Sequence, residues 1–470
     1  MGISMDDTIC AIATPVGEGG IGIVRISGEK AIEITAGLVL LRSAQSLHDI
    51  PSHTLQRADV FVTSIPQVTP GRAHHQGPID EALVVVMRAP HSYTAEDVVE
   101  IHCHGGALVL QTVCEGLISR GARLAEPGEF TKRAFLNGRL NLTQAEAVLD
   151  TIRAKTAGGL RIAQEHLRGV LSKEIDRMRE TLIRLLAHVE AAIDFTEEDI
   201  TFIGPDELLQ GLQQTQSDIR RLAESCREGR ILREGISAAI IGRPNVGKSS
   251  LLNALLRTDR AIVTAVPGTT RDVLEETLNI RGVPIRLLDT AGVRETNDPV
   301  EQEGVKRSRT AMDQAELLLV LLDGSVPLSE EDQDLLAMSQ DKRRIVVVNK
   351  IDLPDQIQAD EFSGFEPIVR ISATTGEGLD DLRDAIRHAV LRADFEPGER
   401  AIVTRARHRA SLLKAGESLE DAMESVHADL SGEFVAMDVR GALDALGEIT
   451  GAVTTDDILD RIFSEFCIGK

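Results

Sequence analysis

The chain has 470 residues, of which 42% are hydrophobic and 27% are charged. This length predicts about three domains, and the composition is that of a globular protein rather than a disordered or fibrous one. The formal net charge of −23 excludes a global positive field that would hold nucleic acid, so any RNA contact must use a local patch.

Cysteine usage and the lack of targeting segments bear on the compartment. The five cysteines are scattered and odd in number, which argues against a secreted disulfide scaffold and favours a reducing cytosol. No basic region followed by an apolar one opens the chain, and no run of about 18 apolar residues occurs. We therefore expect a cytoplasmic protein without a membrane span.

The first half of the chain changes from a mixed pattern to a helical one. Short alternating runs such as 21–26 and 82–87 are typical of strands and predict a mixed α/β domain over residues 1–128. Apolar residues then recur every three or four positions, which predicts two long helices around a bundle core, with a turn at 204–206 between them. The two apolar stripes are Leu167, Leu171, Ile175, Met178, Leu182, Leu185, Val189 and Ala192, and then Leu208, Leu212, Thr215, Ile219, Leu222 and Cys226.

From about residue 233, strands alternate with helices. Continuous apolar runs at 238–241, 285–288, 317–322 and 345–348 suit parallel strands that are buried on both faces. After about residue 394 the helical pattern returns and continues to residue 470. The simplest architecture is an α/β domain inserted between two parts of a helical domain.

The inserted segment carries a phosphate-loop pattern. Residues 242–249 match G-x-x-x-x-G-K-[ST], directly after a predicted strand and before a predicted helix. In such a loop, backbone N–H groups close around phosphate oxygens, Lys248 neutralises the β- and γ-phosphates, and Ser249 is able to ligate Mg²⁺. The context of strand, glycine-rich loop and helix makes a chance match a poor explanation.

Four further segments predict that the nucleotide is GTP. Asp289 ends a buried strand near the Mg²⁺ position, and Gly292 follows near the γ-phosphate. The Asp352 carboxylate is able to accept two hydrogen bonds from guanine, whereas adenine presents no such pair of donors. Segment 372–374 is expected to close over the base, and Thr270 is expected to be a switch residue for Mg²⁺. The residues expected to bind GTP are Asn245, Val246, Gly247, Lys248, Ser249, Ser250, Thr264, Ala265, Val266, Pro267, Gly268, Thr269, Thr270, Asp289, Thr290, Ala291, Gly292, Asn349, Lys350, Asp352, Ser372, Ala373 and Thr374.

These motifs resemble those of the translation-factor-related GTPases, and they predict the domain division. We expect a mixed α/β domain at 1–128, a helical domain formed by 129–232 and 395–470, and a Ras-like P-loop G domain at 233–394. Val293 stands where Ras-like enzymes carry the glutamine that orients water. A hydrophobic residue cannot orient water, so another group must do so.

Motifs outside the G domain are specific to one family. With the phosphate loop, they make the whole chain resemble the MnmE (TrmE) family of tRNA modification GTPases. These motifs are Ala13-Thr14-Pro15 with Gly19 to Gly28, Glu96 to Gly106, Pro127 to Thr131, Arg133 to Gly138, and the C-terminal Ile462 to Lys470.

The resemblance implies a reaction and its partners. A member of this family works with an FAD-binding partner protein, MnmG, in a heterotetramer, and adds a carboxymethylaminomethyl or aminomethyl group to C5 of the wobble uridine of certain tRNAs. Its N-terminal domain forms a homodimer and binds 5-formyl- or 5,10-methylene-tetrahydrofolate, the one-carbon donor. The folate contacts map onto Arg25, Glu100, Arg139 and Lys470, and Arg139 departs from the family, which usually has Lys there.

The resemblance also implies the groups that assist hydrolysis. Glu301 corresponds to the family's water-positioning glutamate, and Lys248 and Arg271 complete the catalytic candidates. Mg²⁺ is expected on Ser249 and Thr270. Potassium, which stimulates hydrolysis in the family, is expected on Asn245, Thr264, Val266 and Thr269.

Several features admit a second interpretation. Residues 17–22 match the dinucleotide fingerprint G-x-G-x-x-G, but a strand pattern rather than a helix follows, so we expect a turn beside the folate pocket. Residues 102–104, His-Cys-His, lack a second ligand pair and are expected to form a strand end rather than a metal site. The basic cluster of Arg405, Arg407, His408 and Arg409 is either an RNA contact or a solvated helix face.

The main competing function is that of an RNA-binding GTPase switch in ribosome assembly, as in Era-type or Der-type GTPases. Those proteins carry a KH-like C-terminal domain or two tandem G domains. One phosphate loop and a helical C-terminal pattern disfavour that alternative here.

Overall fold

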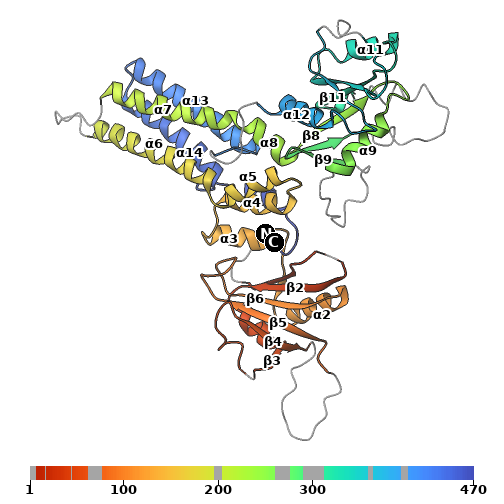
Figure 1. The fold of residues 1–470 in the computed structure, drawn as a ribbon. Coiled ribbons are helices and arrows are strands. Elements are labelled where there is room, and N and C mark those ends of the chain that lie inside the picture. Colours follow the sequence, from red (N-terminus) through yellow and green to blue (C-terminus); the bar gives the residue numbers. More distant parts are fainter. Residues whose placement is uncertain are drawn as a thin grey trace. The chain divides into compact units, whose positions relative to one another are not determined.

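The computed structural model describes residues 7–15, 17–43, 45–61, 77–194, 204–259, 276–288, 312–357, 364–392 and 401–470. Backbone contacts divide the chain into two units, one of residues 1–149 with 450–470 and one of residues 150–449 (Figure 1).

The N-terminal unit is built on a seven-stranded sheet in the order β3-β4-β5-β6-β2-β1-β7, in which only the β1–β7 pair is parallel. The strands are β1 (Ile9–Ile12), β2 (Gly19–Ser27), β3 (Val39–Leu41), β4 (Leu55–Val60), β5 (Asp80–Met87), β6 (Val98–Gly105) and β7 (Arg123–Leu124). Helices α1 (Ala31–Ala36) and α2 (Ala107–Ile118) contribute to the buried cluster on one face of the sheet. Because side chains alternate along a strand, Val24 and Ile26 enter this core while Arg25 lies on the other face.

Both ambiguous motifs of this unit lie on strands. Gly19 opens β2, so the glycine-rich run leads into a strand, as the alternating pattern predicts. Cys103 is buried in β6, as a strand residue should be. Its neighbours have separate partners, because His102 contacts Glu100 whereas His104 contacts Asp80.

Helices from both ends of the chain complete this unit. They are α3 (Glu129–Leu136), α4 (Leu142–Arg153), which crosses the boundary between the units, and α15 (Asp456–Phe463). Leu142 and Leu149 of α4 pack with Phe463 and Phe466 in one buried cluster. The C-terminal tail is joined to the start of α3, since the Gly128 N–H donates to the Cys467 carbonyl at 3.4 Å. The last residues of the chain thereby belong to the N-terminal unit.

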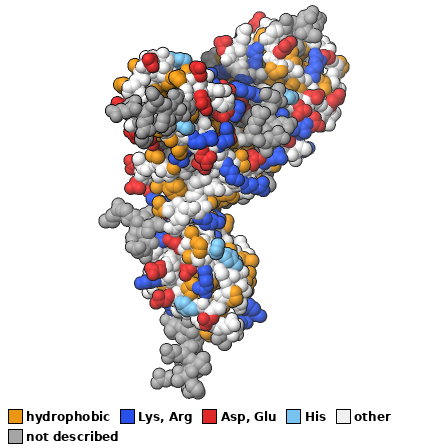
Figure 2. All heavy atoms as spheres, turned by 90° about the vertical axis from the view of Figure 1, so that its left-hand side faces the viewer, with side chains coloured by type: hydrophobic (Ala, Val, Ile, Leu, Met, Phe, Trp, Pro, Cys, Tyr) orange, Lys and Arg blue, Asp and Glu red, His pale blue; other side chains and the backbone are white. Residues whose placement is uncertain are grey.

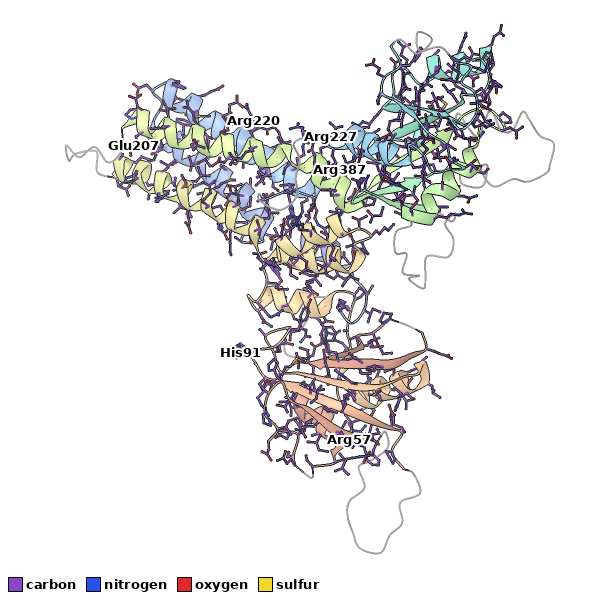
Figure 3. All side chains as sticks on the ribbon, in the orientation of Figure 1. Arg57, His91, Glu207, Arg220, Arg227 and Arg387 are labelled. Carbon is purple, nitrogen blue, oxygen red and sulfur yellow. The ribbon has the colours of Figure 1, made fainter. Side chains whose placement is uncertain are left out.

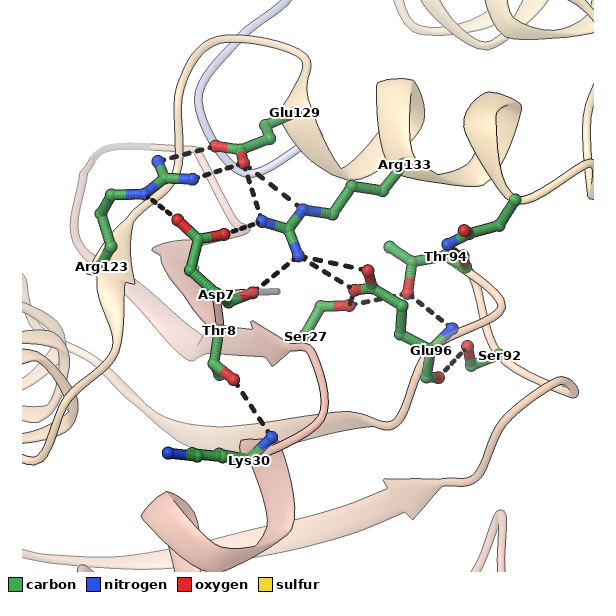
Figure 4. A network of polar contacts seen from close by, with 11 residues as sticks. Asp7, Thr8, Ser27, Lys30, Ser92, Thr94, Glu96, Arg123, Glu129 and Arg133 are labelled. Carbon is green, nitrogen blue, oxygen red and sulfur yellow. Dashed lines mark hydrogen bonds and ion pairs between the residues drawn. The ribbon is translucent and has the colours of Figure 1, made fainter. Parts of the chain in front are cut away.

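A buried guanidinium ties α3 to the sheet (Figure 4). The Arg133 side chain is 1% exposed and contacts carboxylates of Asp7 at 2.5 Å, Glu129 at 3.0 Å and Glu96 at 3.2 Å. Arg123 contacts two of the same groups, Glu129 at 2.7 Å and Asp7 at 2.8 Å. Burial alone would raise the pKa of Glu129, but hydrogen bonds from Arg123, the Glu126 N–H and Arg133 hold that pKa below its usual value.

The second unit contains the helical bundle. Its helices are α5 (Ala157–Leu167), α6 (Val170–Asp194), α7 (Pro205–Glu224), α8 (Cys226–Glu234), α13 (Ala406–His427) and α14 (Gly432–Thr450), the last ending at the unit boundary. The predicted bundle core is confirmed at most of its positions, since Leu182 and Leu212 are fully buried in it, but Ala192 is exposed and does not belong to the core. In Figure 3, Glu207, Arg220 and Arg227 mark the course of α7 into α8.

The helix boundaries differ from the expected ones at two places. Leu167 ends α5 instead of starting the long helix, because Gly169 with φ of 81° breaks the helix before α6. Cys226 begins α8 rather than continuing α7, which ends at Glu224. The apolar period runs across both breaks, so the pattern alone could not locate them.

The α/β part of this unit holds a six-stranded sheet in the order β13-β12-β11-β8-β10-β9, parallel except at β9. The strands are β8 (Ile236–Ile241), β9 (Glu276–Ile280), β10 (Val283–Leu287), β11 (Leu317–Asp323), β12 (Arg344–Asn349) and β13 (Ile368–Arg370). Helices α9 (Lys248–Asp259), α11 (Glu330–Met338) and α12 (Leu379–Val390) accompany the sheet. The predicted fold class, a mixed α/β domain with an α/β G domain inserted in a helical one, is confirmed.

The C-terminal region is helical in residues 401–470, through α13, α14 and α15. This confirms the predicted helical tail and leaves the competing KH-like architecture without support in that part of the chain. On the face seen in Figure 2, acidic and basic side chains are intermixed, as the absence of a global positive field requires.

We predict that Arg133→Met destabilises the N-terminal unit by about 3 to 5 kcal/mol, because it removes the cation that pairs with Glu96 and leaves Asp7 and Glu129 with Arg123 alone. Arg133→Lys should cost less, since the charge remains while the planar fork is lost. Hydrogen exchange of α3 amides measures the effect without assuming two-state unfolding of the whole chain.

Lowering the pH is a second test of this network, because it protonates Glu129. Because its folded pKa is depressed, Glu129 contributes stability above its unfolded pKa of about 4.3, and that contribution is lost as pH falls through the lower folded pKa. Unchanged α3 protection in Arg133→Met would show that the network does not hold the helix.

Candidate functional site

The phosphate loop lies between β8 and α9, at the carboxyl end of a central parallel strand. Helix α9 begins at Lys248, so its free N–H groups and the positive end of its dipole face the loop. Gly247 has φ of 99°, and a Cβ there would lie 2.3 Å from Nδ2 of Asn349. Only glycine therefore permits the loop to approach β12 so closely.

Lys248 is held inside the loop. Its ammonium donates to the carbonyl oxygens of Gly242 and Arg243, both at 2.7 Å. Burial lowers the pKa of Lys248, and the negative charge of Glu331 opposes this shift. A phosphate in the loop would give this ammonium an anionic partner in place of two neutral carbonyls.

Asn349 connects three segments that are far apart in the sequence. Its side chain is buried at the end of β12, where Nδ2 donates to the Val246 carbonyl at 2.8 Å and Oδ1 accepts from the Ala373 N–H at 3.0 Å. One amide thus fixes the phosphate loop against the segment expected to close over the base. This is structural evidence that the separate motifs form a single site.

The residues around Asn349 shape the same edge of the sheet. Lys350, with φ of 68°, contacts Asp323 at the end of β11 at 2.6 Å. Burial alone would raise the pKa of Asp323, but hydrogen bonds from Lys350 and Ser325 hold it below its usual value. Asp352 follows on the turn and is exposed, so its carboxylate is accessible to a ligand.

Five other residues expected to bind GTP are described. Ser372 is buried and Ser249 is half-buried, whereas Asn245, Ser250 and Thr374 are exposed. The other predicted residues of this site lie outside the described part of the chain. They are Thr264, Ala265, Val266, Pro267, Gly268, Thr269, Thr270, Arg271, Asp289, Thr290, Ala291, Gly292 and Glu301, together with Val293.

A second charged site occupies the face of the N-terminal sheet opposite its core. Arg25 of β2 and Glu100 of β6 are Cα partners in the pairing register, and their side chains meet at 2.7 Å. His102 contacts the other carboxylate oxygen of Glu100 at 3.2 Å. Burial alone would raise the pKa of Glu100, but Arg25 and His102 hold it below its usual value, so the group is ionised near neutrality.

The C-terminal lysine lies close to this pair. Lys470 is partly buried, which lowers its pKa, and the charge of Arg25 lowers it further while that of Glu100 raises it. A Cβ on the preceding Gly469 would lie 2.4 Å from the Ile12 carbonyl oxygen, so the end of the chain lies against β1, which pairs with β2. Segments from the two ends of the chain thus meet in the N-terminal unit.

Arg139 lies near Arg25, because both side chains contact the ring of Tyr93. The Arg139 guanidinium lies 5.1 Å from the centre of the Tyr93 ring, and that of Arg25 lies 5.4 Å from it. Arg139 also donates to the Tyr93 carbonyl at 2.9 Å. Arg25, Glu100 and Arg139, three of the residues expected from the family resemblance, are therefore linked directly or through Tyr93.

Sequence reasoning missed three residues at these sites: Tyr93, Phe130 and Asp323. Tyr93 is the only tyrosine in a chain with 3% aromatic residues, and this rarity was a usable signal. Asp323 ends a buried strand of a parallel sheet, which is where ligand-binding residues gather. Phe130 lies in the family motif Pro127 to Thr131, but the motif alone does not indicate which of its residues contacts Arg25.

The described residues contain neither a clustered metal site nor a helix that could cross a membrane. Within the described ranges, no group of three or more His, Cys, Asp or Glu side chains could hold a metal ion. In the same residues, no helix combines the length and apolar character that crossing a membrane would require.

Family models match nearly the whole chain. The model described as "GTP-binding protein TrmE N-terminus" matches residues 8–139, and the one described as "MnmE helical domain" matches residues 142–467. Curated relatives named "tRNA modification GTPase MnmE" match end to end. The protein from Natranaerobius thermophilus is 46% identical over 99% of this chain and 100% of its own length, and that from Geobacillus thermodenitrificans is 45% identical over 99% of each.

Solved structures match over smaller shares of the chain. The G domain of the FeoB iron transporter from T. maritima is 28% identical, with a TM-score of 0.26, and covers 33% of this chain and 99% of that one. Aquifex aeolicus Era bound to GDP and AlF4− is 28% identical, with a TM-score of 0.26, over 39% of this chain and 66% of that one.

We predict that Asn349→Ala weakens nucleotide binding without unfolding the α/β part. The substitution strands the Val246 carbonyl and the Ala373 N–H, and each loss costs about 1 to 3 kcal/mol. Since 1.4 kcal/mol is tenfold in affinity, GTP and GDP should both bind at least about tenfold more weakly in fluorescence titrations.

Asp352→Asn is the matched control, because it alters the expected contact with guanine and leaves the Asn349 bridge from the phosphate loop to Ala373 intact. This variant should lose affinity for GTP and gain affinity for xanthosine triphosphate, because the new amide N–H donors would face the N–H donors of guanine. Undiminished GTP affinity in Asn349→Ala would mean that the bridge is not needed for binding, and undiminished affinity in Asp352→Asn would remove the base assignment.

Proposed function

This chain belongs to the MnmE family of tRNA modification GTPases, and from that premise we propose that it modifies C5 of the wobble uridine of certain tRNAs. The product carries a carboxymethylaminomethyl or aminomethyl group, and its one-carbon unit comes from 5-formyl- or 5,10-methylene-tetrahydrofolate. The observation that carries this proposal is the gathering of Arg25, Glu100, Arg139 and Lys470 in the N-terminal unit.

The charges of these four residues suit a reduced folate. Glu100 is ionised and offers acceptors for the N–H donors on the edge of a pteridine. Arg25, Arg139 and Lys470 supply positive charge for the carboxylates of the glutamate tail. Arg139 in place of the family's usual Lys keeps the charge and adds a planar fork that matches a carboxylate.

The chain hydrolyses GTP as a member of this family, and we propose the groups that assist it. Ser249 and Thr270 would hold Mg²⁺, for which the Ser249 hydroxyl is a suitable oxygen donor in the first turn of α9. Asn245, Thr264, Val266 and Thr269 would hold K⁺, and the two ions would supply positive charge against the phosphates.

Among the protein groups, Lys248 would neutralise the β- and γ-phosphates, and Glu301 would position the attacking water in the place that Val293 cannot serve. Arg271 is the third catalytic candidate, beside the switch residue Thr270. Because Glu301 would act in the transition state, it should affect the rate of hydrolysis more than the affinity for nucleotide.

We further propose the partners and the setting. The N-terminal domain at 1–128 would form a homodimer, and the FAD-binding protein MnmG would join it in a heterotetramer that accepts tRNA in the cytoplasm. The helical domain at 129–232 and 395–470 would connect this domain to the G domain at 233–394. Nucleotide turnover would then control chemistry that takes place elsewhere in the complex.

We predict faster GTP hydrolysis in potassium than in sodium at equal ionic strength, because a cation of suitable size against the phosphates replaces an arginine finger. Asn245→Ala should abolish the difference between the salts, and Ser250→Ala, next to the Mg²⁺ ligand but outside the K⁺ set, should retain it. Equal rates of the unmodified chain in the two salts would contradict the potassium site.

We also predict that 5-formyltetrahydrofolate binds the full chain in calorimetry. Arg25→Ala and Glu100→Ala should each weaken binding by about 1 to 3 kcal/mol, the range for charge-assisted hydrogen bonds. Lys470→Ala should weaken it as well, whereas Arg139→Lys should be tolerated. Failure of the unmodified chain to bind would remove the folate assignment and leave the GTPase assignment standing.

A further inference from the structure

Tyr93 lies between the two arginines of the charged site. Its ring is the shared neighbour of Arg25 and Arg139, whose guanidinium carbons lie 5.4 Å and 5.1 Å from the ring centre. Both distances are within the range in which the negative face of an aromatic ring attracts a cation. Phe130 adds a second ring, 5.7 Å from the Arg25 guanidinium.

The surroundings of Tyr93 fix the position of the ring. Its hydroxyl shares a hydrogen bond of 2.9 Å with the Thr131 hydroxyl on α3. The Asn137 amide, just after α3, donates to the Thr94 carbonyl at 2.7 Å. The ring is therefore held between the β5–β6 connection and α3 by contacts other than those with the two arginines.

Arg25 keeps capacity for a ligand in this arrangement. Within the part of the chain that the structure describes, its side chain donates a hydrogen bond only to Glu100, through Nε at 2.8 Å, and its Nη2 forms an ion pair with the same carboxylate at 2.7 Å. A guanidinium has five N–H donors, so others remain for an anion. The aromatic ring limits the directions in which these donors can point.

We propose that Tyr93 is a positioning residue of the folate site, whose ring holds the guanidinium groups of Arg25 and Arg139 ready for the anionic glutamate tail. This inference rests on the proposed function and adds a residue to it. Long side chains lose rotamer freedom when they bind a ligand, and a ring that restricts them beforehand reduces that loss. A cation at position 139 suits this arrangement, because the face of an aromatic ring attracts the ammonium of Lys as well as the guanidinium of Arg.

Tyr93 also packs in the unit, so the test must separate positioning from stability. Tyr93→Phe keeps the ring and removes only the hydroxyl that contacts Thr131. Tyr93→Leu keeps apolar volume and removes the aromatic face. Both variants are compared in the full chain by calorimetry with 5-formyltetrahydrofolate and with a tetrahydropterin that lacks the glutamate tail.

We expect Tyr93→Phe to bind the folate within about twofold of the unmodified chain and Tyr93→Leu to bind it roughly tenfold more weakly, since a cation–π contact is lost at two arginines. The tetrahydropterin should show little difference between the two variants, because it has no tail for the arginines. GTP affinity should not change in either variant, since the nucleotide site lies on other elements.

A double-mutant comparison tests whether Tyr93 acts through Arg139. If it does, Tyr93→Leu should cost less affinity in an Arg139→Ala background than in the unmodified chain, whereas a purely structural role gives independent losses. Equal folate affinity in Tyr93→Leu and Tyr93→Phe would overturn this inference alone. Absence of folate binding by the unmodified chain would overturn the folate assignment and this inference with it.

Discussion

The N-terminal unit depends on one buried cation. The Arg133 guanidinium binds carboxylates from the segment before β1, the β5–β6 connection and its own helix, and so it fixes α3 against the sheet. That helix carries Phe130 and Thr131, which contact Arg25 and Tyr93. The charged site on the sheet is therefore positioned by an interaction that lies outside it and binds no ligand itself.

The C-terminal tail depends on the same helix. Gly128, directly before α3, donates to the Cys467 carbonyl, and Phe463 and Phe466 pack beside α4. With the tail held there, Gly469 lies against Ile12 and Ala13, so the end of the chain returns to β1, next to the strand that carries Arg25. Residues 25, 100, 139 and 470 can form one site only because residues 450–470, which follow the second unit in the sequence, belong to the N-terminal unit.

The nucleotide site follows a different principle, because its parts meet at the carboxyl ends of neighbouring parallel strands. β8 leads into the phosphate loop, and β12 ends at Asn349, whose side chain joins that loop to Ala373. The parallel strands bring the loops to the same edge of the sheet, and the buried Asn349 amide fixes the phosphate loop against Ala373. This explains how motifs separated by about a hundred residues act on one small ligand.

The nucleotide site has a local sequence pattern and the charged site has none, for physical reasons. A phosphate loop needs glycine and lysine at set spacings, since only these residues provide its backbone shape and its charge. The Arg25–Glu100 pair was found through family resemblance, because a cross-strand contact between positions 75 residues apart leaves no local pattern. The contact of Arg133 with Asp7, 126 residues apart, escaped notice for the same reason. The break at Gly169 was missed because the apolar period continues through it.

Nucleoside mass spectrometry tests most directly whether this chain modifies the wobble uridine of tRNA, as we propose. The host is a strain that lacks its own gene of this family, supplied with the unmodified chain or with Lys248→Ala. The C5-modified wobble uridine should return only with the unmodified chain. Unchanged nucleosides in a strain whose supplied chain hydrolyses GTP and is stably produced would contradict the proposed modification.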